Sequence, residues 1–224
     1  MTTLAIIGAG NVGANLGRRL SMHGYEVTFG VRDLRKAAPL LESIEGPAGL
    51  AMVAEAVAAS DVVFLAVPGN VALEAVAGLD FEGKILVDCT NPIRWDQGPV
   101  WNPPSQGSNA AALAAATNAR VVKAFNTFGA EYHADPDTAF GPIDVQIASD
   151  HAEALDTVAT IAARAGFNPV RAGGLRNAAL LENLAVLWIH LAMVSGLGRG
   201  IAFKLARRES PPDQPRLGAL DVSC

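Results

Sequence analysis

The sequence predicts an α/β fold in which a doubly wound, mostly parallel sheet is followed by a C-terminal helical extension. Short apolar runs alternate with helix-like stretches almost from the first residue, and a glycine-rich turn joins the first such pair. Composition agrees, because half of the 224 residues are hydrophobic while only 6% are aromatic. Ala, Val, Leu and Gly must therefore fill the core, which suits helices packed on a parallel sheet.

The expected strands are short apolar runs bounded by polar or glycine-rich segments. A further short piece near 48–53 is less regular. The strand-like runs are, in order, 4–8, 25–31, 61–68, 84–90, 120–125, 144–149 and 167–173.

A helix-like stretch follows most of these strands, the first running from the glycine turn through His23. The second begins after Asp33, whose side chain is placed to cap it. A polar loop rich in Pro and Gly, which carries Trp95 and Trp101, separates two of the units; it is either an aromatic lid or a packed crossover. The remaining helical stretches are expected at 53–60, 70–79, 108–117 and 151–166.

The character of the chain changes after Gly174. One helical stripe of apolar residues is joined by a second apolar face formed by Leu181, Trp188 and Ala192. A helix that is apolar nearly all round must be buried on more than one side, so one side is expected in this domain's core and the other against a second subunit. The stripe consists of Leu180, Leu184, Leu187, Leu191 and Val194.

Charge and cysteine content limit the classes of function. The net charge of −5 argues against a general nucleic-acid binder. Cys89 and Cys224 form neither a disulfide framework nor a zinc-binding spacing, so no metal site is expected. The longest apolar run, 184–198, has 15 residues, whereas roughly 20 are needed to span a bilayer. With no signal peptide recognisable, we expect a cytoplasmic protein without a membrane partner.

The turn after the first strand has the spacing G-x-G-x-x-G, formed by Gly8, Gly10 and Gly13. The first glycine permits the tight turn, the second lets the backbone approach a pyrophosphate, and the third lets helix and strand pack closely. An ordinary glycine-rich βα turn is the alternative. Because the motif opens an α/β chain in the required strand–helix context, it predicts a Rossmann-type dinucleotide site.

Cations follow the second strand where an acidic residue would be expected for NAD. Arg32 lies 19 residues after Gly13, at the position that meets the adenosine ribose. A guanidinium there pairs with the 2′-phosphate of NADP, and Lys36 adds a second cation. The alternative is a solvated helix start in which Asp33 compensates Arg32. NADP(H) is the predicted cofactor.

Three further segments make a family resemblance visible: "DCTNPI" (88–93), "VVKAFNTFGA" (121–130) and the long segment 180–205. The chain resembles the deazaflavin coenzyme (F-420)-dependent NADP reductases, a group related to the NADPH-binding domains of six-transmembrane metalloreductases. The resemblance runs from residue 3 to about 207. It implies a homodimer, paired through 180–205, that passes a hydride between NADPH and a planar deazaflavin or flavin-type acceptor.

The resemblance also implies roles for individual residues. The family often has Ser or Thr before the arginine, and Val31 lacks that hydroxyl, which implies a weaker preference for NADPH. The residues that the resemblance places against the cofactor are Gly8, Gly10, Asn11, Val12, Gly13, Val31, Arg32, Lys36, Val67, Pro68, Asn91, Pro92, Ala124, Asn126 and Thr127.

The sequence has no obvious constellation for proton transfer, and hydride transfer between stacked rings needs alignment more than an acid or base. Asn126 could orient the nicotinamide carboxamide or an acceptor carbonyl, or simply cap a turn. We expect His133 to be a surface-loop residue and His190 a core or interface residue. Ser195 and the glycines of 196–200 either leave room for a flat ring or serve helix packing.

Two other functions remain open at this point. A reductase of a small carbonyl or imine compound would need a proton donor, for which Lys123 is the nearby candidate. A protein that binds NADP(H) without turnover, as a sensor, fits the sparse site equally well. The expected organisation is an NADP(H)-binding domain at 1–172, a helical segment at 173–208 for acceptor and dimer contacts, and a tail at 209–224.

Overall fold

A six-stranded parallel sheet lies at the centre of the computed structural model, which describes residues 2–206. Its strand order, β3-β2-β1-β4-β5-β8, reverses direction at β1, so the carboxyl ends of β1 and β4 flank a crevice where such folds bind ligands. The strands are β1 (Leu4–Ile7), β2 (Val27–Val31), β3 (Ala48–Met52), β4 (Val62–Leu65), β5 (Ile85–Asp88) and β8 (Arg120–Lys123).

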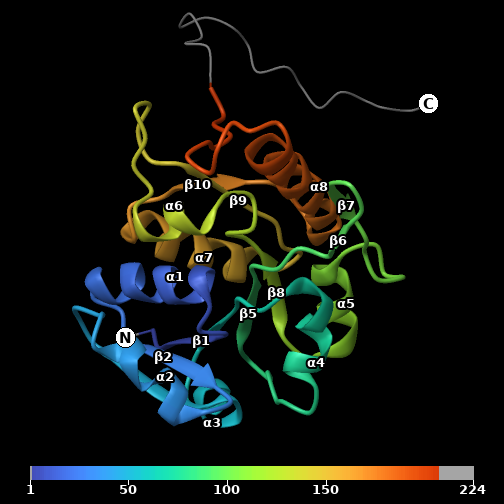
Figure 1. The fold of residues 1–224 in the computed structure, drawn as a ribbon. Helices are drawn as coiled ribbons and strands as arrows, with labels where there is room; N and C mark the ends of the chain where they lie inside the picture. The colour runs from blue at the N-terminus through green and yellow to red at the C-terminus, as the bar shows by residue number, and fades with distance from the viewer. Residues whose placement is uncertain (1, 207–224) are drawn as a thin grey trace, which may run out of the picture.

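Helices cover both faces of this sheet (Figure 1). Because side chains alternate along a strand, Leu4 and Ile6 of β1 join the core beneath α1 and α7, whereas Ala5 and Ile7 join the core beneath α3, α4 and α5. The doubly wound prediction is therefore confirmed. The helices are α1 (Asn11–Met22), α2 (Leu34–Leu41), α3 (Val53–Ala58), α4 (Ala72–Val76), α5 (Asn109–Ala116), α6 (Ala130–Ala134) and α7 (Ala152–Arg164).

Two small sheets accompany the central one. The strand predicted at 167–173 exists as β10 (Asn168–Arg171), but it pairs in parallel with β9 (Asp144–Ile147) outside the central sheet. The segment expected as a tryptophan-bearing loop contains an antiparallel hairpin of β6 (Ile93–Trp95) and β7 (Pro99–Trp101). Strict β–α alternation is thus interrupted at this hairpin.

The C-terminal extension begins with a 3₁₀ turn, η2 (Leu175–Asn177), and continues as α8 (Ala178–Ile189) and a π-helical turn, η3 (His190–Val194). The helix expected over 180–205 therefore ends at Val194, and residues 195–206 have no regular structure. The predicted tail at 209–224 lies outside the described residues.

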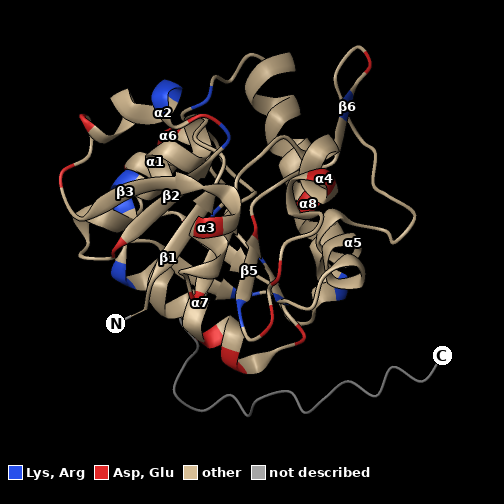
Figure 2. Ribbon diagram, turned by 90° about the horizontal axis from the view of Figure 1, so that it is seen from below, with Lys and Arg blue, Asp and Glu red and all other residues tan. Residues whose placement is uncertain are grey.

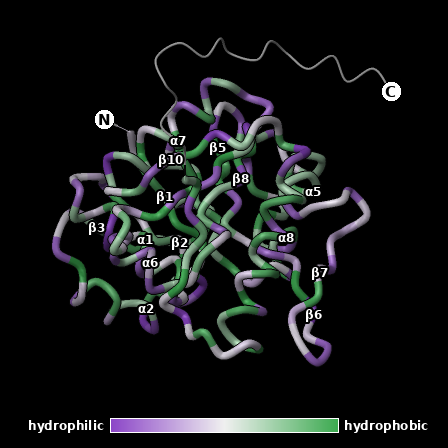
Figure 3. The backbone as a smooth tube through the Cα atoms, turned by 90° about the horizontal axis from the view of Figure 1, so that it is seen from above, coloured by the Kyte–Doolittle hydropathy of each residue, from purple (hydrophilic) through white to green (hydrophobic). Residues whose placement is uncertain are grey.

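One helical run, Leu175–Val194, has the length and apolar composition that a membrane span would require, which the shorter run counted from the sequence did not suggest. This run contains Glu182, whose side chain is fully buried against the edge strand β8, so this side of the helix packs on the domain. Hydrophobic residues follow the central strands in Figure 3, and Figure 2 shows basic residues at α2 and acidic residues on α3 and α4.

Candidate functional site

The glycine turn has the backbone geometry that phosphate binding requires. Gly8 has φ +104°, a conformation that favours glycine, and a Cβ on Gly13 would overlap the carbonyl oxygen of Gly8. Gly10 faces open space instead, with no atom within 4 Å of where its Cβ would lie. No side chain of residues 2–206 caps the N-terminus of α1 at Gly10, so its first amide N–H groups are available to an anion.

Arg32 follows directly after β2 and is exposed to solvent. It forms no ion pair with any residue in the range 2–206. The carboxylate of Asp33 is otherwise engaged: it accepts hydrogen bonds from the amides of Arg35 and Lys36, as the predicted cap of α2, and lies 3.9 Å from the Lys36 Nζ. Asp33 therefore forms no direct ion pair with Arg32.

A cleft of about 1020 Å³ connects the glycine turn to these cations. It lies at the carboxyl ends of β1, β2 and β4, and apolar side chains of α3 and α4 form its far wall. Glu74 of α4, which the sequence reading did not single out, also lines it. The predicted cofactor residues on its lining are Gly8, Gly10, Val31, Arg32, Lys36, Val67 and Pro68.

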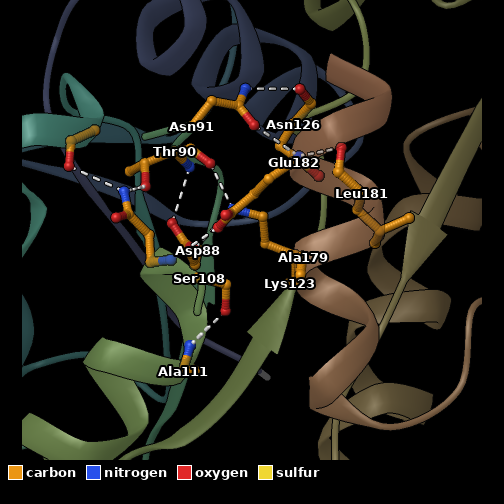
Figure 4. A network of polar contacts seen from close by, with 12 residues as sticks. Asp88, Thr90, Asn91, Ser108, Ala111, Lys123, Asn126, Ala179, Leu181 and Glu182 are labelled. Atoms are coloured by element: carbon orange, nitrogen blue, oxygen red, sulfur yellow. Dashed lines mark hydrogen bonds and ion pairs between the residues drawn. The ribbon is translucent and has the colours of Figure 1, made fainter. Parts of the chain in front are cut away.

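Asn91 and Asn126, which follow β5 and β8, form a reciprocal pair beyond this cleft (Figure 4). The side-chain amide of Asn91 donates to the backbone carbonyl of Asn126 over 2.9 Å, and Asn126 Nδ2 donates to Asn91 Oδ1 over 2.8 Å. Asn126 Nδ2 also donates to the Leu181 carbonyl of α8 over 3.1 Å. Two separately predicted site residues are thus brought together, and Asn126 links strand ends to α8.

Three other predicted residues lie inside the domain and off the cleft lining. Ala124 is fully buried and its amide donates to the Asp88 carbonyl. Thr127 is 3% exposed, and its hydroxyl donates to the side chain of Gln146 on β9. Pro92 is buried as well. They contribute to the shape of the strand ends rather than to the cleft surface.

A buried charge cluster joins the ends of β5 and β8 to α8. Lys123 Nζ lies 2.8 Å from Asp88 Oδ2 and 3.2 Å from Glu182 Oε1, and all three side chains are fully buried. Burial raises the pKa of Glu182, an effect that the Lys123 ammonium opposes. A signal for this cluster was present in the sequence, because each of the three charged residues lies inside an apolar run. Charged residues are rarely buried unless they are paired, so these three could have been expected to pair with one another.

The histidines differ from expectation. His133 is a buried residue of α6, not a surface-loop residue; its two ring nitrogens lie 3.1 Å from the Gly129 carbonyl and 3.0 Å from the Phe125 carbonyl. Burial lowers the pKa of His133 to about 4. His190 is exposed, which excludes the core role.

Other reactive groups do not add to the site. Cys89 is buried, and burial raises the pKa of its thiol well above the usual range, which keeps it unreactive. Cys224 lies outside the described residues. Within the range 2–206 there is no cluster of three or more His, Cys, Asp or Glu residues that could hold a metal ion.

Sequence comparisons connect this arrangement to known proteins. Residues 3–92 match the family model described as NADP oxidoreductase, coenzyme F420-dependent. The F420-dependent NADP reductase of Methanothermobacter marburgensis is 32% identical over 203 residues, which cover 82% of this chain and 89% of that protein. Metalloreductase STEAP3 of Rattus norvegicus is 34% identical over 182 residues, 80% of this chain but 35% of that longer protein.

Solved structures give the same connection. A crystal structure from Arthrobacter sp. FB24, provisionally assigned as an F420-dependent NADP-reductase, has a TM-score of 0.82 at 30% identity and covers 92% of this chain and 100% of that one. A reductive aminase from Aspergillus terreus, in complex with NADPH and ethyl-5-oxohexanoate, has a TM-score of 0.64 at 24% identity, covering 88% and 63% of the two chains. The second likeness is one of fold alone.

Proposed function

The chain belongs to the family of F420-dependent NADP reductases, and we propose that it transfers a hydride between NADP(H) and a deazaflavin or flavin-type acceptor. The observation that carries the proposal is Arg32, an exposed guanidinium without an ionic partner in the described chain, on the same cleft as the glycine turn. A 2′-phosphate supplies the anion that this guanidinium lacks.

The residues of the cleft fit the dinucleotide. The amides of Asn11, Val12 and Gly13 at the start of α1 would hold the pyrophosphate, next to the open space at Gly10. Arg32 and Lys36 would hold the 2′-phosphate, and Val67 and Pro68 after β4 would border the adenosine. The apolar wall from α3 and α4 suits the adenine ring.

The described residues bind and orient rather than exchange protons. Nicotinamide, when bound, supplies or accepts the hydride, and transfer between stacked rings needs contact and alignment. Lys123, the candidate donor for a carbonyl or imine reductase, has its ammonium engaged by two carboxylates and is fully buried. His133 is likewise enclosed. Both observations favour hydride transfer to a deazaflavin or flavin-type acceptor over reduction of a carbonyl or imine, which needs a proton donor from the protein.

A second copy of the chain is the proposed protein partner. The face of α8 that turns away from the domain exposes Leu180 and Leu187, at 66% and 47% respectively, and Val194 continues it at 44%. Burying such a face contributes favourable free energy, and α8 is the element that the sequence predicted for pairing. We propose a homodimer in the cytoplasm whose other partner is the small-molecule acceptor.

The experiment that tests the function is steady-state NADPH oxidation with F420, FMN and a ferric chelate as parallel acceptors. Turnover with F420 alone supports the proposed activity, whereas turnover with FMN or iron broadens the acceptor class. If NADPH binds but none of the three acceptors is reduced, the proposal of a deazaflavin or flavin-type acceptor is wrong, and a small-molecule reductase or a sensor function takes its place.

A further inference from the structure

The ammonium of Lys123 is fully satisfied inside the protein. It donates to Asp88, to Glu182 and to the backbone carbonyl of Thr90, which accounts for its three N–H donors (Figure 4). Buried ion pairs add little unless their remaining atoms are also hydrogen-bonded, and this condition is met here. The cluster is therefore a rigid junction at the ends of β5 and β8.

Glu182 extends this junction to two more elements. Its Oε1 accepts from the amide of Asn109 at the start of α5 over 2.9 Å, and its Oε2 accepts from the indole N–H of Trp101 on β7 over 3.0 Å. One carboxylate thus joins α8 to β8, α5 and the hairpin. Since each contact has its own direction, α8 cannot slide or rotate at residue 182 without breaking several hydrogen bonds.

The residue before Glu182 fixes the orientation of the Asn126 amide. The carbonyl of Leu181 can only accept a hydrogen bond, so the atom of Asn126 that faces it must be Nδ2. The second N–H of Nδ2 is used by Asn91. Asn126 is only 4% exposed, and its Oδ1 is left buried with no hydrogen-bond partner among residues 2–206.

Resting on the proposed function, we propose that Asn126 Oδ1 accepts a hydrogen bond from the carboxamide N–H of the nicotinamide, and that Lys123 and Glu182 are positioning residues that hold it ready through Leu181. An acceptor-ring carbonyl is excluded as the partner of Asn126, because both amide N–H groups are already engaged. A small side-chain movement beside Asn126 must admit the donor, since Oδ1 is closed to solvent.

The test compares the affinity of the protein for NADP⁺ with its affinity for the 3-acetylpyridine analogue, which has a methyl ketone in place of the carboxamide. The unaltered chain is expected to prefer NADP⁺ by about tenfold, the effect of one hydrogen bond to a buried acceptor. Asn126→Ala should abolish this preference. Calorimetry measures both affinities without requiring turnover.

The positioning role has its own variants. Glu182→Gln, and the milder Trp101→Phe, should each reduce the preference for NADP⁺ while leaving the affinity for 2′,5′-ADP unchanged, because that ligand lacks nicotinamide. Glu45→Gln, at an exposed site without an ion pair in the described chain, is the matched control. Binding of 2′,5′-ADP also shows that each variant is folded.

The outcomes separate the claims. An unchanged preference in Asn126→Ala overturns the acceptor assignment. Loss of the preference in Asn126→Ala, but not in Glu182→Gln or Trp101→Phe, overturns the positioning role alone. If the unaltered chain binds neither NADP⁺ nor 2′,5′-ADP, the proposed function fails and the inference fails with it.

Discussion

At the scale of single residues, Arg32 is the side chain on which the proposed cofactor preference rests. Its guanidinium is free at the end of β2 because the neighbouring carboxylate of Asp33 caps α2 instead. The side chain of Val31 is buried at 7% exposure and offers no hydrogen bond. Under the proposed function, selectivity for the 2′-phosphate is expected to depend on Arg32, with Lys36 in support.

Substituting Arg32→Ala should weaken NADPH binding by about 10- to 100-fold, the range for charge-assisted hydrogen bonds, and NADH binding far less. Dissociation constants for both cofactors measure the effect. Arg35→Ala is the control, since Arg35 lies on the same exposed helix start but is not on the cleft lining. Equal losses for NADPH and NADH would remove the role assigned to Arg32.

His133 couples stability to pH. Its folded pKa, about 4, lies below the unfolded value of 6.5, so between these values only the unfolded chain takes up the proton. The contribution of neutral His133 to the free energy of unfolding is complete above pH 6.5 and is lost as the pH falls toward 4. The loss amounts to about 3 kcal/mol. The carboxyl pKa values of Asp61 and Glu131 are also lowered in the folded chain, and protonation of these groups decreases stability at lower pH than that of His133.

Urea unfolding of the unaltered chain should therefore show a decline in the free energy of unfolding between pH 6.5 and 4.5. His133→Gln should flatten that decline, although it lowers stability at pH 7 because the ring contacts to Phe125 and Gly129 are lost. His151→Gln, at an exposed site, should leave the profile unchanged. The same slope in His133→Gln and in the unaltered chain would contradict this account.

At the scale of elements, α8 has apolar residues on two opposite sides. Leu181, Ala185 and Trp188 pack into the domain, whereas Leu180 and Leu187 remain exposed. The two apolar faces predicted from the sequence are therefore present, but only one of them has a partner within the described chain. The hairpin lies against the end of this helix, with Gly98 close to His190 and Val194.

Introducing charge on the exposed face of α8 should prevent dimer formation. The double variant Leu180→Glu/Leu187→Glu is expected to sediment as a monomer, whereas the unaltered chain sediments as a dimer, because buried like charges without partners are costly. Leu73→Lys on α4, another exposed leucine, is the control. A monomeric unaltered chain would refute the dimer proposed through α8.

The molecule as a whole is acidic, with a net charge of −5, yet it gathers cations where the cleft meets α2. Figure 2 shows that acidic residues lie across from them on α3 and α4. The local arrangement, not the overall charge, determines which anion binds.

Because a cofactor binds only the folded chain, NADPH should raise the thermal unfolding temperature. At 100 times the dissociation constant the gain is about 2.7 kcal/mol, and NADH at the same concentration should give less. Differential scanning fluorimetry measures both shifts, and 2′,5′-ADP tests whether the adenosine end suffices. Identical shifts for NADPH and NADH would argue against NADP(H) as the cofactor.

The local features of the chain were predictable because they depend on neighbouring residues. Short apolar runs identified five strands of the central sheet, with β3 noted only as a short, less regular piece. The spacing of Gly8, Gly10 and Gly13 identified the glycine turn, and Asp33 identified the start of α2. Each of these results from a short-range rule of backbone conformation or hydrogen bonding.

Pairings between distant segments were decided by the tertiary structure alone. Lys123, Asp88 and Glu182 meet only because β5, β8 and α8 pack together, and the burial of His133 follows from the packing of α6. No spacing rule relates residues that lie 35 or 59 positions apart. The sequence by itself thus determined the fold class and the cofactor end of the cleft, whereas the packing of α8 determined the orientation of the Asn126 amide.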